Sequence, residues 1–388
     1  MAIVNVEDAR RLARRRLPRI FFDYIDGGAF AEKTRQANEA DFGDILLKQS
    51  VLTGAHTPDL ATHFLGRKFS LPFMLGPVGF LGLYASNGEQ KAARAAHAAG
   101  TALCLSTFSI ASLADLRRAT AGPLHFQLYV LKDRLLADEM MAAAAAAGAD
   151  VLFVTVDCTV TAVRERDLRN GFRSLTHLTP SLMLKLATKP RWLLDIGLRG
   201  GRSVRAIDHR PDFGRGILAQ AANLSKGIDP SLTWNDVAWI RSRWKGILVI
   251  KGVMSPEDAA RAKDAGADGI VVSNHGGRQL DGVSSTIQAL PAVRHAVGAD
   301  FCVMFDGGIR RGTDIVKAIA LGADGVMLGR AYTFALAAAG ERGVADIITV
   351  LREEIDKTLA LMGIASIAEL KERGSDIVHH RFGRPGRY

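Results

Sequence analysis

The chain has 388 residues, of which 48% are hydrophobic and 23% charged, values that exclude a fibrous or largely disordered protein. Its three cysteines, Cys104, Cys158 and Cys302, are widely spaced, so we expect a reducing compartment, no disulfide framework and no metal site. The formal net charge of +10 favours anionic partners, but no recognised motif accompanies it, and we expect no nucleic-acid partner.

Residues 1–65 are predicted to form an N-terminal helical extension with a loop at Gly27 and Gly28. The basic run from Arg10 to Arg16 is typical of the solvated face of a helix. This region lacks the apolar core of a signal peptide, and no stretch of the chain approaches the roughly 18 apolar residues that cross a bilayer. We expect a cytoplasmic location, with at most peripheral contact with the inner face of the cytoplasmic membrane.

Eight short apolar runs that end in turn or polar residues predict eight strands, and helical stretches such as 86–99 and 255–265 separate most of them. The predicted strands are 71–79, 102–107, 124–130, 151–157, 247–252, 269–276, 301–309 and 325–330. Gly-Ala-Asp recurs before four strands, at Gly148, Gly266, Gly298 and Gly322, where the glycine can end a helix in a left-handed conformation. This alternation predicts a single α/β domain over 1–388, a (β/α)8 TIM barrel with parallel strands.

Residues 158–245 form a long insertion after the fourth strand. Within it, residues 178–201 mix Leu, Met and Trp with Lys185, Lys189 and Arg191, a composition that suits the surface of an anionic membrane. A lid of loops and helices packed on the barrel has the same composition. From composition alone, both interpretations stay open.

Polar residues close almost every predicted strand, at the end of the barrel where active sites of this fold lie. Asp306-Gly-Gly-Ile-Arg310 and Gly329-Arg330 follow strands seven and eight, the frequent phosphate site, where glycine backbone and arginine can bind an anion. Lys251 ends strand five. It could be a Schiff-base nucleophile, a phosphate partner or a charge that stabilises an anionic heterocycle.

The most specific feature is the loop Ser273-Asn-His-Gly-Gly-Arg278 after strand six. His275 and Arg278 lie three residues apart between glycines, so both can face one ligand. That pair suits removal of a proton beside a bound carboxylate. Asp157, at the end of strand four, is a candidate to orient the imidazole and to favour its charged form after proton transfer.

These residues resemble a known family, the FMN-dependent L-2-hydroxy acid dehydrogenases and oxidases, and the resemblance spans nearly the whole chain. Ser273-Asn-His-Gly-Gly-Arg-Gln-Leu-Asp281 is similar to the active-site signature of this family, whereas the two phosphate segments are shared with other flavin barrels. The resemblance implies FMN as cofactor and a small 2-hydroxy acid as substrate. It also implies a homo-oligomer, by family habit a tetramer.

The resemblance also assigns roles to residues. The residues implied to hold FMN are Pro77, Val78, Gly79, Ser106, Gln127, Thr155, Lys251, Ser273, Asp306, Gly307, Gly308, Ile309, Arg310, Gly329 and Arg330. The residues implied around the substrate are Tyr24, Tyr129, Arg164, His275 and Arg278. His275 is implied as the catalytic base with Asp157 as its partner, and Tyr129 and Arg278 complete the catalytic set.

Three departures from the glycolate-oxidase pattern favour the subgroup of (S)-mandelate and L-lactate dehydrogenases. Gly79 replaces the alanine usual in oxidases, Val78 replaces the common threonine, and Phe108 stands in place of a tryptophan. The first two favour a quinone or other electron acceptor over oxygen, and the third disfavours a very small substrate. Segments 163–168 and 190–195 also resemble this subgroup, which favours peripheral membrane contact through 178–201.

Alternative functions remain at this level. The related one is an oxidase that reduces oxygen to hydrogen peroxide. From other classes come a Schiff-base lyase that uses Lys251, an FMN isomerase without net redox chemistry, and a catalytically silent scaffold bound through the basic insertion.

Overall fold

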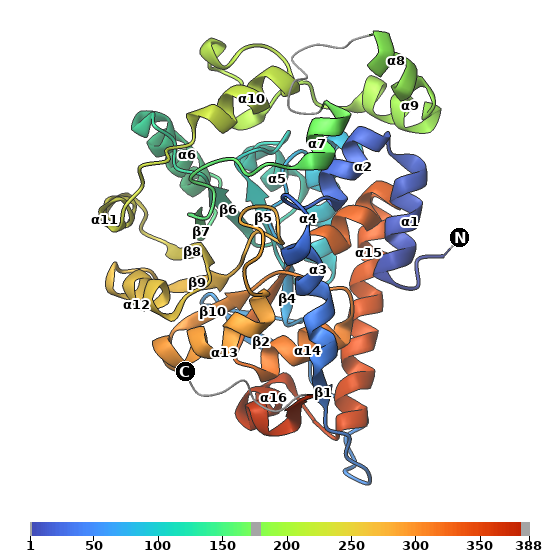
Figure 1. Ribbon diagram of the computed structural model, residues 1–388, viewed down its shortest axis with the longest axis vertical. Helices are drawn as coiled ribbons and strands as arrows, with labels where there is room; N and C mark the ends of the chain where they lie inside the picture. The colour runs from blue at the N-terminus through green and yellow to red at the C-terminus, as the bar shows by residue number, and fades with distance from the viewer. Residues whose placement is uncertain (1, 172–179, 382–388) are drawn as a thin grey trace.

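The computed structural model describes residues 2–171 and 180–381, and a closed barrel of parallel strands forms its centre (Figure 1). Hydrogen bonds join the strands in the order β10-β11-β4-β5-β6-β7-β8-β9. These strands are β4 (Phe73–Leu75), β5 (Leu103–Ser106), β6 (Leu124–Leu128), β7 (Val151–Thr155), β8 (Ile247–Val253), β9 (Gly269–Val272), β10 (Cys302–Phe305) and β11 (Gly325–Leu328). The predicted barrel is therefore confirmed.

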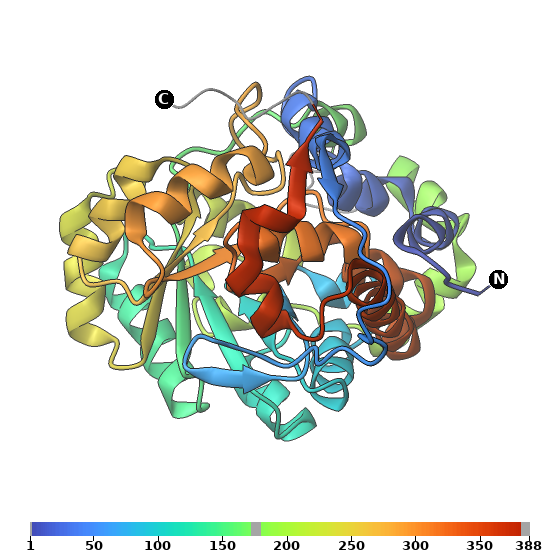
Figure 2. The ribbon, with the colours of Figure 1, turned by 90° about the horizontal axis from the view of Figure 1, so that it is seen from below.

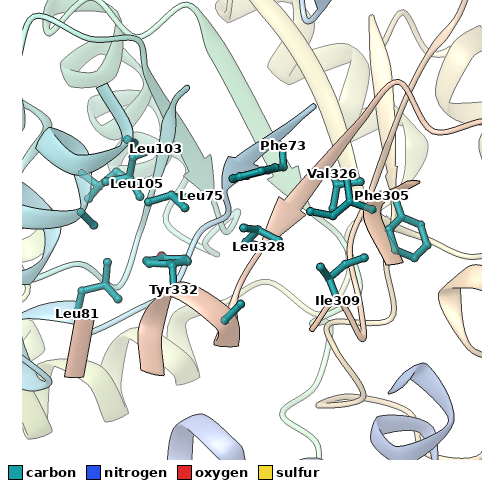
Figure 3. Close-up of a cluster of buried hydrophobic side chains, with 14 of the residues drawn as sticks. Phe73, Leu75, Leu81, Leu103, Leu105, Phe305, Ile309, Val326, Leu328 and Tyr332 are labelled. Carbon is teal, nitrogen blue, oxygen red and sulfur yellow. The ribbon is translucent and has the colours of Figure 1, made fainter. Parts of the chain in front are cut away.

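The barrel strands are apolar on both faces because each face is covered. Along β4, Phe73 and Leu75 point outward to the helices, and Met74 points into the barrel interior. Figure 3 shows the outer layer, in which these two side chains meet Leu103, Leu328 and Tyr332. Continuous apolar runs of four to eight residues are the pattern of such doubly covered strands.

Helices connect the strands on the outside of the barrel. They are α4 (Gly88–Ala98), α5 (Leu113–Ala119), α6 (Arg134–Ala146), α12 (Pro256–Asp264), α13 (Thr286–Val297), α14 (Gly312–Ala320) and α15 (Arg330–Met362). The four glycines of the Gly-Ala-Asp repeat have positive φ, between 74° and 110°. The aspartates also have a role, since Asp268 and Asp324 accept the backbone N–H of Leu248 and Val303, both at 2.8 Å.

A hairpin closes the amino-terminal end of the barrel. It consists of β2 (Thr62–Phe64) and β3 (Arg67–Phe69), which pair antiparallel across the bottom of the molecule (Figure 2). Phe64 and Phe69 stack with ring centroids 4.3 Å apart and join the interior cluster. The interior is therefore packed at this end, and ligands can enter from the opposite end.

The N-terminal extension contains α1 (Val6–Arg16), α2 (Arg19–Asp26) and α3 (Lys33–Ala40), followed by β1 (Ile45–Leu47). After α15, the chain forms α16 (Ile367–Arg373) and β12 (Val378–His380). β12 pairs antiparallel with β1, and the two strands lie side by side in Figure 2. The two ends of the described chain therefore hold each other on the barrel.

The insertion between β7 and β8 contributes five helices in its described part. These are α7 (Glu165–Asn170), α8 (Pro180–Ala187), α9 (Pro190–Arg199), α10 (Ile217–Gly227) and α11 (Trp234–Arg243). Residues 178 and 179 of the predicted membrane segment lie outside the described residues. Among the helices of the described ranges, none has the length and apolar character needed to span a bilayer.

Asp26 joins the extension to the insertion. Its side chain is 3% exposed and accepts hydrogen bonds from Arg10 of α1, at 2.6 and 2.9 Å, and from Arg166 of α7, at 2.8 Å. Burial raises the pKa of Asp26, but the two guanidinium groups outweigh it and lower this pKa from 3.8 to about 2. Asp26 is therefore ionised in the folded protein at any physiological pH.

This depressed pKa gives a stability term with a defined pH dependence. The term is present above pH 3.8 and is lost as the pH falls through 3.8 toward 2, and a shift of this size is worth about 2 kcal/mol. We expect Asp26→Asn to lower the urea midpoint at pH 6 and the difference from wild type to shrink by pH 3. Glu7→Gln, which removes only the exposed partner of Arg10, is the control and should change the midpoint little. A difference that stays constant with pH contradicts this role.

Candidate functional site

A cavity of about 400 Å³ opens at the carboxyl end of the barrel. Residues that follow all eight barrel strands line it, together with Tyr24 of α2 and one face of α10. Ligand sites of globular proteins have this size, and barrel enzymes place them at this end. The predicted catalytic and binding residues are described around this cavity.

His275 lies in the loop after β9 and is held from two sides. Its Nδ1 lies 3.0 Å from Oδ1 of Asp157, and its Nε2 lies 3.4 Å from the hydroxyl of Tyr129. Burial lowers the pKa of His275, and the neighbouring carboxylate of Asp157 offsets this only in part. A neutral imidazole whose Nδ1–H donates to Asp157 keeps its Nε2 lone pair for a proton, as a general base requires.

The backbone around His275 is unusual. Its φ is 58°, in the left-handed region, and the next two residues, Gly276 and Gly277, also have positive φ. A Cβ on Gly277 would lie 2.4 Å from the backbone nitrogen of Arg35 in α3, so only glycine allows this approach. Positive φ at a non-glycine residue is a form of strain that clusters at functional sites.

Asp157 depends on a second glycine. A Cβ on Gly252, at the end of β8, would lie 2.7 Å from both Cβ and Cγ of Asp157. Burial raises the pKa of Asp157, but the charges of His275 and Lys251 and a hydrogen bond from Cys158 outweigh it and lower this pKa. The carboxylate is therefore ionised and stabilises a positive charge on the imidazole.

Arg278 and Arg164 surround the ring of Tyr24. The guanidinium carbons lie 4.9 and 5.8 Å from the ring centroid, and Nη1 of Arg278 donates to the backbone oxygens of Tyr24 and Gly27. Within the described residues, the other nitrogens of Arg278 make no hydrogen bond, and they remain available to a ligand. Two arginines and a tyrosine beside His275 suit a carboxylate.

Lys251 is buried on β8, where it faces Asp306 and Ser273. Its Nζ lies 2.7 Å from Oδ2 of Asp306 and 2.8 Å from Oγ of Ser273. Burial lowers the pKa of Lys251, but the carboxylates of Asp306 and Asp157 outweigh it and raise this pKa. A stable ammonium is a poor Schiff-base nucleophile, whereas it suits stabilisation of a buried negative charge.

Two buried polar atoms in the cavity wall fit a flavin. Nε2 of Gln127 and Oγ1 of Thr155 have no hydrogen-bond partner within the described structure, although burial of such groups without one is costly. Oε1 of Gln127 already accepts from Ser106. The carbonyl and N–H groups of an isoalloxazine edge can satisfy both free atoms, beside the ammonium of Lys251.

The phosphate end of a flavin fits the loops after β10 and β11. Gly307 and Gly308 have φ of 109° and 77°, and Gly329 precedes the first turn of α15. Arg310 and Arg330 lie beside them, and all five residues line the cavity. Burial, together with neighbouring arginines, lowers the pKa of Arg330, so an anion here would relieve repulsion between like charges.

The structure brings the predicted site residues together. Of the residues implied to hold FMN, all but Ser273 line the cavity, and Ser273 supports Lys251 from behind. The five residues implied around the substrate also line it, and Asp157 stands behind His275. Sequence reasoning missed Tyr84 and Cys158, and it missed Leu218, Ala221 and Ser225 on α10. No local pattern shows that this helix returns over the barrel mouth.

Comparison with known proteins identifies relatives over the full length. The FMN-dependent dehydrogenase family matches residues 13–376. An L-lactate dehydrogenase of Caulobacter vibrioides is 47% identical over 96% of this chain and 97% of its own length. The crystal structure of the monotopic membrane protein (S)-mandelate dehydrogenase has a TM-score of 0.92 and 38% identity, covering 98% of this chain and 100% of its own. A mandelate oxidase solved with (S)-4-hydroxymandelic acid has a TM-score of 0.82 and 34% identity, with coverage of 95% and 97%.

The phosphate site can be tested with two ligands that differ by one group. Arg310→Met removes a charged donor, and such hydrogen bonds are worth about 1.5–3 kcal/mol, so the Kd of the apoprotein for FMN should rise roughly 10- to 100-fold. Riboflavin lacks the phosphate, and its Kd should change little. Flavin fluorescence titration measures both. An equal loss for the two flavins would place the phosphate elsewhere.

Proposed function

Since this chain belongs to the FMN-dependent dehydrogenase family and is an enzyme that oxidises 2-hydroxy acids with FMN, we propose that His275 is the base of the reaction. The observation that carries this proposal is the chain of contacts from Tyr129 through His275 to Asp157 at the cavity wall. The substrate is an L-2-hydroxy acid whose carboxylate binds Arg278 and Arg164. Bound FMN supplies the two-electron oxidant.

The residues of the chain divide the work. Nε2 of neutral His275 takes a proton from the carbinol group of the substrate, and Asp157 stabilises the imidazolium that forms. The hydroxyl of Tyr129 stays protonated because burial, the largest influence, raises its pKa well above the ordinary value. It can therefore donate a hydrogen bond to the oxygen of the substrate. Lys251 lies where negative charge on the reduced flavin would be stabilised.

The substrate side chain is apolar and larger than that of glycolate. Phe108, Val160, Leu218 and Ala221 give the cavity an apolar wall, and Phe108 packs edge-on against Tyr129 with centroids 5.4 Å apart. A lactate- or mandelate-like side chain fits this wall. The paired ammonium of Lys251 argues against the Schiff-base lyase.

Anaerobic reduction tests the reaction and its base. L-lactate or (S)-mandelate should bleach the yellow enzyme without oxygen. His275→Asn should keep its flavin but be reduced more slowly by a factor of about 10²–10⁴ or more, since positioned bases contribute this much. His209→Asn, which alters an exposed histidine, is the control. Reduction of His275→Asn at the wild-type rate would transfer the role to another group.

The electron acceptor of the proposed reaction is a membrane quinone. An apolar patch supports this choice, formed by Met183 and Leu184 of α8 and by Leu193, Leu194 and Leu198 of α9, all between 43 and 79% exposed. A surface of this kind beside basic residues suits the interface of an anionic membrane. The similar (S)-mandelate dehydrogenase is itself a monotopic membrane protein.

The patch is firmly attached to the barrel. Trp192 of α9 is buried and donates from Nε1 to the backbone oxygen of Leu83 at 2.7 Å, and its ring packs on Phe21 of α2. Asp195 accepts from Ser86 and Arg16 on the same inner face. The outer, apolar face of α9 is therefore presented by a fixed element and is not a segment awaiting burial in the chain (Figure 1).

One variant tests acceptor and membrane contact together. Leu184, Leu194 and Leu198 changed to serine should lose most binding to vesicles that contain anionic lipid, and with it turnover with quinone in those vesicles. Turnover with a soluble dye should not change. Val51, Leu52 and Leu361 changed to serine are a matched control, since these exposed apolar side chains lie elsewhere. If oxygen supports faster turnover of wild type than quinone or dye, the oxidase alternative replaces this proposal.

A further inference from the structure

Cys158 has no role in the proposed reaction, yet it contacts the residues that do. Its Sγ lies 3.3 Å from Oδ1 of Asp157 and 3.4 Å from Nδ1 of His275, and the latter two atoms lie 3.0 Å apart. A thiol, a carboxylate and an imidazole therefore meet at one point. Cys158 and His275 both line the cavity, so a small solute can reach this point from the substrate side.

We propose that Asp157, Cys158 and His275 form a binding site for a zinc-like divalent cation that inhibits the enzyme. Around a tetrahedral zinc ion, bond lengths of about 2.0–2.3 Å place sulfur, nitrogen and oxygen ligands roughly 3.3–3.6 Å from one another. The three atoms here lie at or a few tenths of an ångström below these separations. Small side-chain shifts are enough to bring all three onto one ion, and the cavity leaves room for a fourth ligand, water.

The charges of the site also suit a divalent cation. Oδ2 of Asp157 is buried and has no hydrogen-bond partner in the described part of the chain, so the carboxylate keeps an unmet need for a positive neighbour. Asp157 and a thiolate at Cys158 together balance the two positive charges of the ion. Lys251, the nearest lysine, has its own carboxylate, Asp306. The combination of sulfur, nitrogen and oxygen ligands selects a borderline or soft cation such as Zn²⁺ or Cd²⁺ over Mg²⁺.

Binding would change the protonation of His275. The thiol proton of Cys158 leaves to solvent, and the proton on Nδ1 of His275 moves to Nε2 as the metal takes its place. One proton is released for each ion bound. Nε2 then carries hydrogen and has no lone pair for the substrate, and Asp157 is no longer free to stabilise an imidazolium. Inhibition therefore rests on the proposed role of His275, whereas binding of the ion does not.

Equilibrium dialysis of the FMN-loaded enzyme against ZnCl₂ tests binding directly. Wild type and Cys302→Ala should each retain about one Zn²⁺ per chain more than Cys158→Ala. Loss of a ligand should weaken binding by at least about 100-fold, since changes outside the ligand shell already cost roughly 10- to 100-fold. Cd²⁺ should add an ultraviolet thiolate-to-metal absorption band to wild type and not to Cys158→Ala. Equal metal retention by all three proteins, or no retention, overturns the site.

Turnover with dye acceptor tests the consequence. Zn²⁺ should inhibit wild type and Cys302→Ala at concentrations at least tenfold below those that affect Cys158→Ala, and EDTA should restore activity. Inhibition of Cys158→Ala at the same concentration would show that zinc acts elsewhere and overturns the proposal. If zinc binds through Cys158 and turnover is unchanged, the site stands and the role of His275 as base is contradicted.

Discussion

Closure of the parallel barrel is the constraint on which the site depends. Because the last strand pairs with the first, the ends of eight strands form one ring, and residues as distant in sequence as Pro77 and Arg330 face the same cavity. The packed interior and the hairpin of Phe64 and Phe69 close the other end. Loops can therefore carry chemistry at the mouth while the strands carry the stability.

Within the ring, charges are separated into two regions. Asp157 and Asp306 accompany His275 and Lys251, so each cation or base in the middle of the cavity has a buried carboxylate. Arg278 and Arg330 instead bond backbone oxygens, which do not neutralise them. The two arginines create a field that favours anions at two places, and a flavin phosphate and a substrate carboxylate are the two anions that the proposed reaction requires.

The sequence predicted the barrel well because its signals are local. Each strand is an apolar run next to turn residues, and the glycines of the Gly-Ala-Asp repeat occupy the left-handed conformation that was expected. The Ser-Asn-His-Gly-Gly-Arg loop was found because its composition is rare, although the positive φ of His275 was not foreseen. α10 and Asp26 were missed, since their partners lie far away in sequence and no periodic pattern reports such contacts. Cys158 was dismissed for its spacing from other cysteines, whereas its partners are a histidine and an aspartate.

The pairing of β1 with β12 has a consequence for the order in which the protein is completed during synthesis. Residues 45–47 leave the ribosome early, but their partners, residues 378–380, are made long after them. Until then the segment that follows the helix of Tyr24 lacks its sheet partner and exposes an unpaired strand edge. The part of the site supplied first by the chain is therefore among the last to be fixed, and a nascent chain cannot form a complete substrate cavity before the end of β12 is synthesised.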